Sequence, residues 1–372
     1  MTIDPGTLAA YEAGAATYAA RSHPPDEDGP RALVAAATGP VLDLGCGTGR
    51  YLERLGPTVV GVEPSAAMLG EARHAVPGAM VVRAAAGALP LRPRSVGGTW
   101  ANKVLQHVDR GDLPVVLADL HRSMAVGAPL SARLFCGDGD QRSDDDLPGR
   151  RFVLWHPEDL ADLVLGAGFA DVETDPSTWP LPADHPAVIS TGADGRTFAF
   201  LTVRAARARS LPDTVAPGMR LLVCGLNPSL HAADAGVGFA GPGNRFWPAM
   251  TDAGLLPDGV DRDPWALLRE GRIGMTDLVK RATPRADEVT TAEFRAGVER
   301  VGRLCARLAP AAVVVVGLTG WRAGLDPKAT AGWQPAPLGP TPVYVMPSTS
   351  GLNAGTSRAD LVRHLRAAAD GH

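Results

Sequence analysis

The sequence predicts an α/β protein built from two domains. Its 372 residues exceed the length of one typical domain. Short β-branched runs alternate with segments of helical period on both sides of residues 205–218, a stretch with two prolines and no periodicity. We therefore expect one domain at residues 1–204, a linker at 205–218 and a second domain at 219–372.

The expected elements of the first domain follow the βαβ pattern of a twisted, mostly parallel sheet. After a helical segment at 8–20, its strands are expected at residues 41–44, 59–62, 81–82, 98–101, 131–135 and 198–203. The second domain repeats the alternation, with strands at 221–226, 312–316 and 343–345 and helices at 245–253, 291–308 and 357–369.

Composition places the chain among soluble globular proteins, with 45% apolar and 20% charged residues. No apolar run approaches the roughly 18 residues that span a bilayer, and no secretory signal pattern opens the sequence. The four cysteines, Cys46, Cys136, Cys224 and Cys305, form no C-x-x-C pair. We expect a cytoplasmic protein with reduced thiols, no metal site and no membrane partner.

Charge is distributed unevenly between the two halves. From Met219 onward there are 17 basic and 14 acidic residues, and the preceding part carries 19 basic and 26 acidic residues. The difference fits two modules with different partners, although +3 over some 150 residues is also within ordinary variation.

A glycine-rich loop follows the first expected strand, in the run VLDLGCGTG at residues 41–49. Glycines allow positive φ and close approach of the backbone to a ligand, and the helix that follows has an electropositive N-terminus. Asp43 lies inside the strand, and Glu63 ends the next strand, where an acid can accept hydrogen bonds from both ribose hydroxyls. The spacing G-x-G-x-G differs from the dinucleotide form G-x-G-x-x-G.

Over residues 40–204 the chain resembles the class I S-adenosylmethionine-dependent methyltransferases. Further matches are the runs NKVLQH at 102–107 and GAGF at 166–169. The resemblance implies a Rossmann-like domain that binds S-adenosyl-L-methionine through Asp43, Gly45, Gly47, Gly49 and Glu63. The family's third strand usually ends in an Asp that contacts the adenine amine, and Ala85 stands there in this chain. That change predicts weaker adenine recognition.

The methyl acceptor is a small molecule or another acceptor that the sequence does not define. The chain lacks an Asn/Asp-Pro-Pro-aromatic tetrad for an exocyclic base amine and a Pro-Cys nucleophile for cytosine, so a nucleobase is disfavoured. Gln106 and His107 are candidates to face the acceptor, with His107 as a base. The alternative is that His107 is a supporting or surface residue.

Two loops of the second half follow expected strands and carry small polar residues. The first is GLNPS at 225–229, followed by Phe239 and the run NRFW at 244–247. The second is STSGLN at 348–353. Loops at the carboxyl ends of parallel strands are where an open α/β sheet builds its site.

These residue types suit hydrolysis of an N-glycosidic bond in DNA. Asn227 can position water through its amide, Phe239 can stack on a flipped base, and backbone N–H groups can stabilise the departing base. Leu352, between Gly351 and Asn353, can enter the duplex as an apolar wedge. Neither loop holds an Asp, Glu or Lys, which predicts a monofunctional enzyme without lyase activity.

Structural interpretations of the same residues compete with these roles. Asn227 before a proline fits an Asx turn, and Phe239 alone fits a core position. We assign Phe246 and Trp247 mainly to the core, with Asn244 as N-cap. Arg245 is expected to meet either a phosphate or a nearby acid.

From about Arg220 to the C-terminus the chain resembles the mismatch-specific uracil- and thymine-DNA glycosylases of the uracil-DNA glycosylase superfamily, including the run TDLVK at 276–280. The resemblance implies a three-layer α/β/α domain that needs no cofactor, and a duplex substrate with a G·U or G·T mismatch. It makes Asn227 the water-positioning residue, and it implies base contacts from Gly225, Leu226, Phe239 and Ser348 and a wedge from Ser350, Gly351, Leu352 and Asn353. Ser229 replaces the family's glycine, and Ala354 stands where well-known members have an arginine.

Together these features predict a DNA glycosylase for uracil, thymine or adducted cytosine opposite guanine, fused to a methyltransferase-like domain. One alternative is that methyl transfer to a small molecule is the main activity. Another is that the first domain serves only as a scaffold or ligand sensor.

Overall fold

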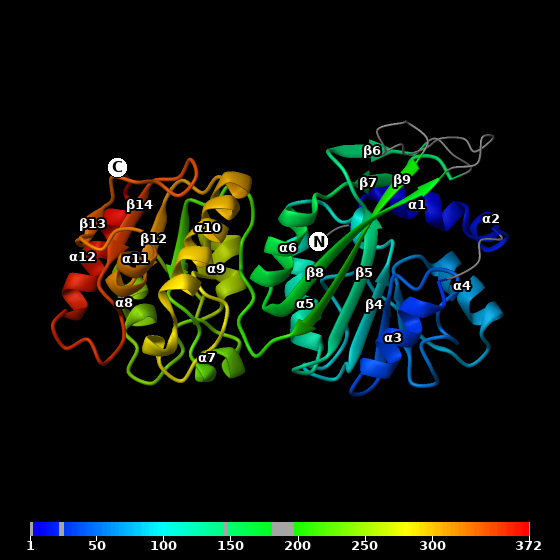
Figure 1. Cartoon of the computed structure of the whole chain (residues 1–372), viewed down its shortest axis with the longest axis horizontal. Helices are drawn as coiled ribbons and strands as arrows, with labels where there is room; N and C mark the ends of the chain where they lie inside the picture. The colour runs from blue at the N-terminus through cyan, green and yellow to red at the C-terminus, as the bar shows by residue number, and fades with distance from the viewer. Residues whose placement is uncertain (1–2, 22–25, 144–146, 181–196, 372) are drawn as a thin grey trace. The chain divides into compact units, whose positions relative to one another are not determined.

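The computed structural model describes residues 3–21, 26–143, 147–180 and 197–371. It divides into two compact units, each an α/β fold (Figure 1). Unit 1 comprises residues 1–165 and 169–208, and unit 2 comprises residues 166–168 and 209–372.

Unit 1 is built on a seven-stranded sheet of order β3-β2-β1-β4-β5-β9-β8, in which β9 runs antiparallel to both of its neighbours. The strands are β1 (Val41–Leu44), β2 (Val60–Glu63), β3 (Met80–Arg83), β4 (Gly98–Asn102), β5 (Pro129–Phe135), β8 (Phe169–Pro180) and β9 (Thr197–Arg207), and a separate ribbon pairs β6 (Asp140–Arg142) with β7 (Arg151–Val153). The expected strands are confirmed. The order reverses between β1 and β4, and such a switch point is where open sheets bind ligands.

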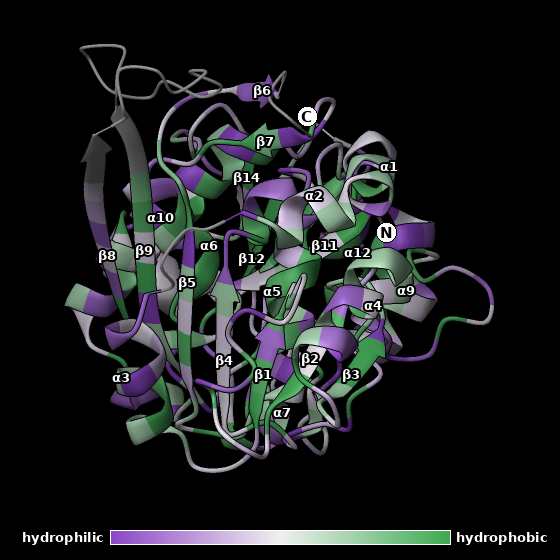
Figure 2. Ribbon diagram, turned by 90° about the vertical axis from the view of Figure 1, so that its right-hand side faces the viewer, coloured by the Kyte–Doolittle hydropathy of each residue, from purple (hydrophilic) through white to green (hydrophobic). Residues whose placement is uncertain are grey.

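Helices cover the sheet of unit 1 and bury its apolar side chains. They are α1 (Pro5–Ala13), α2 (Ala15–Ala19), α3 (Asp28–Ala36), α4 (Ala66–Ala75), α5 (Leu113–Ser123) and α6 (Pro157–Gly166), with a 3₁₀ turn at Leu105–His107. Hydrophobic and hydrophilic residues alternate along α3 (Figure 2), and its Leu33 joins a core with Val41 and Trp100. The helix expected at 8–20 is broken at Gly14, a poor helix former.

Unit 2 is built on a five-stranded sheet of order β11-β10-β12-β14-β13, parallel except for β13. The strands are β10 (Leu221–Gly225), β11 (Ile273–Asp277), β12 (Val313–Val316), β13 (Gly332–Trp333) and β14 (Val343–Met346). The three strands expected in this half are confirmed as β10, β12 and β14. The order reverses at β10, so the loops after β10, β11 and β14 meet at one edge.

Unit 2 has the expected three-layer α/β/α arrangement. Its helices are α7 (Leu230–Ala235), α8 (Phe246–Asp252), α9 (Pro264–Gly271), α10 (Thr291–Leu308), α11 (Leu318–Gly324) and α12 (Arg358–Ala369), with a 3₁₀ turn at Ala286–Glu288. Side chains of α8, α9 and α12 share one core with alternate residues of the strands, such as Leu221 and Val223. Helices α10 and α11 pack together on the opposite face.

Residues 205–218 were expected to form a linker, but the structure places them partly in a strand and partly in a buried segment. Residues 205–207 end β9, and Leu211, Asp213, Thr214 and Val215 are buried. Thr214 exchanges backbone hydrogen bonds with Met275 at 2.9 Å in both directions. The segment lacks periodicity because single side chains and one bridge hold it, and these contacts come from residues far away in the sequence.

Within the described part of the chain, no helix has the length and apolarity to cross a bilayer. Across those same residues, no three His, Cys, Asp or Glu side chains are grouped closely enough to hold a metal ion.

Candidate functional site

The glycine loop of unit 1 leaves β1 at the switch point of the sheet and continues into turns, not into the helix that the sequence predicted. Gly45, Gly47 and Gly49 all have positive φ, which favours glycine. A Cβ on Gly45 would lie 2.5 Å from Val104, whereas a Cβ on Gly47 would meet nothing within 4 Å. The loop therefore packs against Val104 on one side and leaves open space at Gly47.

Glu63, at the end of β2, is held against this loop. Its carboxylate accepts hydrogen bonds from the backbone N–H groups of Gly47 at 3.2 Å and Ser65 at 3.0 Å. Burial raises the pKa of Glu63 to about 6, and the two backbone donors oppose that rise. The carboxylate is thus fixed in position beside the loop.

Asp43 is a buried acid with an unsatisfied oxygen. It is 2% exposed, and its Oδ2 has no hydrogen-bond partner among the described residues. Burial raises the pKa of Asp43 to about 8, and the charge of Glu63 contributes to the rise. A buried polar atom without a partner is costly, so a ligand that donates a hydrogen bond would be stabilising here.

A mainly apolar cavity opens beside the loop at the carboxyl ends of β1 and β2. It is lined by Ile3, Leu44, Gly45, Val62, Pro64, Ala84, Ala85, Ala86, Val104, His107, Val108 and Val116. These walls suit a flat aromatic ring. Ala85 lies on the lining but offers a ring no side-chain acceptor, which agrees with the predicted weaker adenine recognition.

His107 is not placed to act as a base. Its Nδ1–H donates to the Arg151 carbonyl at 2.7 Å, and its Nε2 accepts from the Tyr11 hydroxyl at 2.9 Å. Burial lowers the pKa of His107 to about 4. The supporting role is therefore the correct interpretation, because both ring nitrogens are engaged. Gln106 is also buried.

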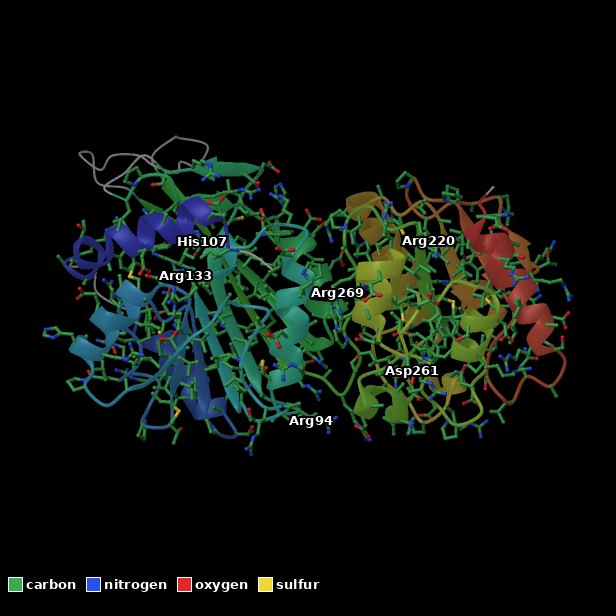
Figure 3. The ribbon with its side chains drawn as sticks, turned by 180° about the vertical axis from the view of Figure 1, so that it is seen from behind. Arg94, His107, Arg133, Arg220, Asp261 and Arg269 are labelled. Atoms are coloured by element: carbon green, nitrogen blue, oxygen red, sulfur yellow. The ribbon has the colours of Figure 1, made fainter. Side chains whose placement is uncertain are left out.

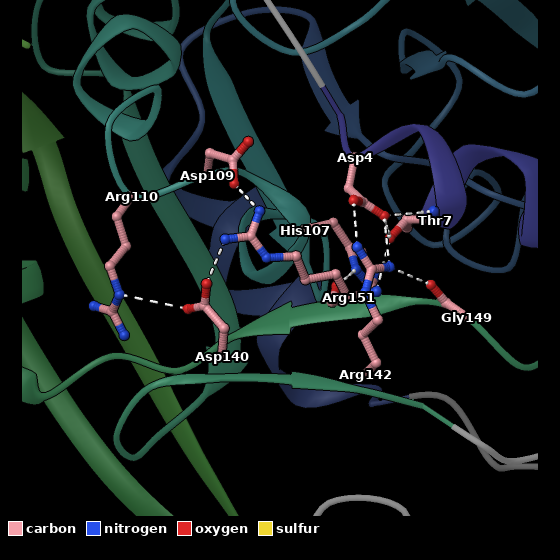
Figure 4. A network of polar contacts seen from close by, with 9 residues as sticks. All are labelled: Asp4, Thr7, His107, Asp109, Arg110, Asp140, Arg142, Gly149 and Arg151. Atoms are coloured by element: carbon pink, nitrogen blue, oxygen red, sulfur yellow. Dashed lines mark hydrogen bonds and ion pairs between the residues drawn. The ribbon is translucent and has the colours of Figure 1, made fainter.

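The N-terminal helix α1 is tied over this cavity by polar contacts (Figure 4). The Arg142 guanidinium pairs with Asp4 at 2.9 Å and holds the pKa of that carboxyl at about 2. The Arg151 N–H donates to the Thr7 hydroxyl at 2.8 Å. These contacts place Ile3 in the cavity wall. They were not predictable from the sequence, because they join residues far apart in the chain.

In unit 2, Asn227 follows β10 and its amide orientation is fixed. Nδ2 donates to the Arg281 carbonyl at 3.1 Å and to the Thr283 hydroxyl at 2.7 Å, and it lies 3.3 Å from the Pro228 carbonyl. Because carbonyls accept only, the NH₂ group must face them. Oδ1 points away and accepts no hydrogen bond from the described residues, so it can accept one from water.

Phe239 lies beside the end of β10. Its ring stacks on Phe246 at 4.1 Å between centroids, and its Cζ lies 3.5 Å from the position of a Cβ on Gly225. Phe239 has φ of +58°, a conformation that is strained for a bulky residue. Phe246 and Trp247 are buried in the core, as expected.

Asp277, at the end of β11, is a candidate site residue that the sequence analysis did not single out. It pairs in register with Gly225 and lines the same cavity as Phe239. Burial raises the pKa of Asp277 to about 6, against the opposing effect of Lys280. The strand that Asp277 ends, β11, has no run of β-branched residues. For that reason its place beside β10 was not predicted from the sequence.

Lys280 is engaged in a buried ion pair. Its Nζ lies 2.7 Å from Asp213 Oδ1, and Arg300 Nη1 lies 2.9 Å from Asp213 Oδ2. All three side chains are at most 6% exposed. The amine of Lys280 is therefore held by a carboxylate, away from any role as a free nucleophile.

The loop at 348–353 is braced by its own side chains and by the segment after Phe239. Asn353 Nδ2 donates to the Ser348 carbonyl at 2.8 Å, and Ser348 Oγ accepts from the Ser350 N–H at 3.2 Å. A Cβ on Gly351 would lie 3.0 Å from the Gly243 carbonyl. Leu352 is 95% exposed at the tip.

Arg245 pairs with no acid among the described residues, and its contact with a phosphate stays a prediction. Its guanidinium donates to the carbonyls of Ser350 at 3.0 Å, Asn353 at 2.7 Å and Thr356. Arg245 also occupies the N-cap position of α8, while Asn244 Oδ1 accepts from the Phe246 N–H at 3.0 Å. The arginine shapes the exposed loop, because carbonyls of a turn lie closer than any acid.

The strand register brings the loops after β10 and β14 to the same level along the sheet. Cys224 of β10 pairs with Val315 of β12, which pairs with Val345 of β14. The first residues after β10 and β14 are therefore two strand spacings apart, about 10 Å. The Arg245 N–H also donates to the Thr349 carbonyl at 2.9 Å. The structure thus brings Asn227, Phe239, Asp277 and the loop at 348–353 to one edge of the sheet.

Comparisons with known proteins match the N-terminal and C-terminal parts of the chain to two different families. Residues 212–369 match the family model of the uracil DNA glycosylase superfamily, and residues 41–127 match that of a methyltransferase domain. The chain thus joins a domain of that superfamily to a methyltransferase domain.

Similar solved structures include a methyltransferase from Thermotoga maritima described as a possible histamine N-methyltransferase. It is 22% identical, covers 48% of this chain and 89% of its own, and has a TM-score of 0.36. A SAM-dependent methyltransferase from Methanosarcina mazei is 17% identical over 45% of this chain and 92% of its own, with a TM-score of 0.38. A phosphoethanolamine N-methyltransferase from Haemonchus contortus is 15% identical over 54% of this chain and 57% of its own, with a TM-score of 0.40.

Proposed function

We propose that unit 2 hydrolyses the N-glycosidic bond of uracil opposite guanine in duplex DNA, with thymine and adducted cytosine as further substrates. The observation that carries the proposal is the fixed amide of Asn227. Two acceptors, the Arg281 carbonyl and the Thr283 hydroxyl, hold its NH₂ group, so Oδ1 is oriented to accept a hydrogen bond from water.

In the proposed reaction the water oxygen bonds to the sugar C1′ as the bond from C1′ to the base nitrogen breaks. The electron pair of that bond leaves with the base, and the water gives up a proton to the base or solvent. Backbone N–H groups of the loop after Gly225 stabilise the departing anion, and Phe239 stacks on the flipped ring. Asp277, which lines a cavity together with Phe239, offers a carboxyl group to the polar edge of the base.

Hydrolysis without strand cleavage is the expected outcome. An amine nucleophile would be needed to open the sugar through an imine. Lys280 is buried against Asp213 and Arg300 and so is withheld from such a role. We therefore infer an intact abasic site as the product.

We assign DNA gripping to the loop at 348–353. Leu352 is 95% exposed, and the loop beneath it is braced by Asn353 and Arg245. An apolar residue on a rigid tip can enter the base stack and fill the space of the flipped nucleotide. Ser348, below the tip, faces the base pocket in this proposal.

The test is release of free uracil from a duplex with one G·U pair. The full-length protein is compared with Asn227→Ala and with the control Asn244→Ala, which removes another loop amide. We expect Asn227→Ala to lose about 10²- to 10³-fold in rate, as for loss of one positioned polar group. Absence of activity in the unaltered protein, or equal rates in both variants, would refute the proposal.

For unit 1 we propose binding of S-adenosyl-L-methionine, which supplies a methyl group to a small-molecule acceptor. Three observations support it: the open space at Gly47, the carboxylate of Glu63 beside it, and the unpartnered Oδ2 of Asp43. Glu63 would accept from the ribose hydroxyls, and the loop with Gly45, Gly47 and Gly49 would contact the rest of the cofactor.

Calorimetric titration with S-adenosyl-L-methionine tests this assignment and separates the alternatives. Binding followed by methyl transfer supports an active enzyme. Binding without turnover, together with a changed rate of uracil release, would make unit 1 a sensor for unit 2. Absence of binding would leave unit 1 a scaffold.

A further inference from the structure

Cationic side chains gather near the carboxyl ends of β4 and β5 in unit 1, and Lys103 directly precedes Val104 of the cavity lining. Lys103 directly follows β4, and Arg133 lies on the adjacent β5, with the Lys103 N–H donating to the Arg133 carbonyl at 2.6 Å. Arg50 follows the glycine loop, and its guanidinium donates to the Arg21 carbonyl at 3.0 Å. Figure 3 labels Arg133 and His107 at the same end of this unit.

Lys103 and Arg133 share one aromatic ring. Lys103 Nζ lies 5.0 Å and Arg133 Cζ lies 4.4 Å from the centroid of Phe200. Phe200 is itself stacked on Phe135, with centroids 5.1 Å apart. The buried aromatic pair therefore sets the position of both cations.

Two members of this group, Lys103 and Arg133, form no ion pair within the described part of the chain, and Arg133 Nε is buried without a hydrogen-bond partner there. Burial among protein atoms and the neighbouring Arg133, Arg50, Arg21 and Arg150 lower the pKa of Lys103 to about 8, although its side chain still reaches solvent. Like charges held this close favour a bound anion.

Four described acids on neighbouring elements are engaged elsewhere. Asp4 pairs with Arg142, the Glu12 carboxylate accepts from the Ser65 hydroxyl at 2.5 Å, Glu63 accepts from backbone N–H groups at the glycine loop, and Asp26 accepts from the N–H groups of Asp28 and Gly29. None of these four carboxylates pairs with Lys103 or Arg133, so both cations can pair with an anionic ligand.

The same geometry argues against a cationic acceptor. A quaternary or protonated amine is recognised through the open faces of aromatic rings. Lys103 and Arg133 already lie over Phe200, and Arg150 lies over both Tyr11 and Phe152 at 5.5 and 5.3 Å. A second cation would meet their charges.

We propose that the methyl acceptor of unit 1 carries a carboxylate or phosphate group, and that Lys103 and Arg133 bind this group beside the cofactor. The inference rests on the methyl transfer proposed above. In the transfer, a lone pair of the acceptor's nucleophilic atom forms a bond to the methyl carbon. The carbon–sulfur bond breaks, its electron pair stays on sulfur as a neutral thioether, and the proton of the nucleophile passes to solvent.

One other anion could meet these cations, namely the methionine carboxylate of the cofactor itself. The two sources are distinguished by titrating the demethylated product S-adenosylhomocysteine, which keeps that carboxylate. If Lys103 and Arg133 read the acceptor, their loss leaves its affinity unchanged.

The experiment uses the full-length protein with saturating S-adenosylhomocysteine and, in parallel, without it. Benzoate, its neutral counterpart benzamide and inorganic phosphate are titrated by calorimetry. The variants are Lys103→Met, Arg133→Met and the conservative Lys103→Arg, with the exposed Arg73→Met on α4 as control. Thermal melting confirms that each variant is folded. If Arg133→Met does not fold, Lys103→Met still tests the proposal.

We expect benzoate or phosphate to bind at least tenfold more tightly than benzamide. Lys103→Met and Arg133→Met should lose at least tenfold in anion affinity, Lys103→Arg should retain it, and Arg73→Met should match the unaltered protein. Equal binding of benzoate and benzamide with no phosphate binding would overturn the proposal. So would a matching loss of S-adenosylhomocysteine affinity. Absence of S-adenosylhomocysteine binding alone refutes the cofactor assignment, while the parallel titrations still decide the anion site.

Discussion

The two candidate sites of this chain occupy equivalent places in their sheets but are built from different chemistry. Both lie at the carboxyl ends of parallel strands where the strand order reverses. In unit 1 the central groups titrate: burial raises the pKa of Asp43 to about 8 and that of Glu63 to about 6. In unit 2 the central group is the neutral amide of Asn227, held by hydrogen bonds. A shared architecture therefore carries titrating carboxyl groups in one unit and a neutral amide in the other, which fits the different functions proposed for the two units.

The largest expected effect is a loss of thermal stability in unit 2 alone. Asp213→Ala leaves Lys280 and Arg300 buried without their carboxylate, and breaking a buried ion pair costs about 3–5 kcal/mol. We expect unit 2 to melt at a clearly lower temperature and uracil release to fall, while S-adenosylhomocysteine binding persists. Calorimetric melting measures this, with Asp261→Ala, an exposed aspartate of unit 2 (Figure 3), as control. Loss of both activities together would show that the units are not independent.

Glu63→Ala tests the role of a carboxyl group in the candidate site of unit 1. Removing a charged hydrogen-bond acceptor costs about 1.5–3 kcal/mol, roughly 10- to 150-fold in affinity. S-adenosylhomocysteine affinity should fall by that factor while uracil release stays unchanged. The exposed Glu53→Ala is the matched control, and an unchanged affinity in Glu63→Ala would remove Glu63 from the cofactor site.

The pH dependence of cofactor binding should follow the same carboxyl group. Glu63 must be ionised to accept from the ribose, and its pKa is about 6, so binding must expel a proton below that pH. Affinity should fall about tenfold for each pH unit below 6. Titrations between pH 5 and 8 check this, and an affinity that rises on acidification would contradict the assignment.

The sequence predicted those parts of the molecule that local patterns encode. Helix α10 begins and ends at the predicted residues 291 and 308, and the structure shows a capping box of Thr290 and Glu293 at its start. Contacts between distant residues were not visible: the Tyr11–His107 hydrogen bond joins residues 96 apart, and Arg300 meets Asp213 across 87 residues. The same reason explains why the place of Asp277 and the loop contacts of Arg245 were not predicted.

The smallest expected effect concerns Leu352. Leu352→Ala shortens the exposed tip, so uracil release from a G·U duplex should fall about five- to tenfold, because the flipped state loses its filler. Release from single-stranded DNA should be unchanged. Leu325→Ala, another exposed leucine of unit 2, is the control, and equal losses on both substrates would argue against a wedge.

The central claim is that one chain holds two separable sites, one centred on Asn227 and the other on Glu63. The most direct measurement assays uracil release from G·U duplex and S-adenosylhomocysteine binding in the same preparations of Asn227→Ala and Glu63→Ala. The account predicts that Asn227→Ala loses uracil release and keeps binding, and that Glu63→Ala does the reverse. A variant that loses both functions, or neither, would contradict it.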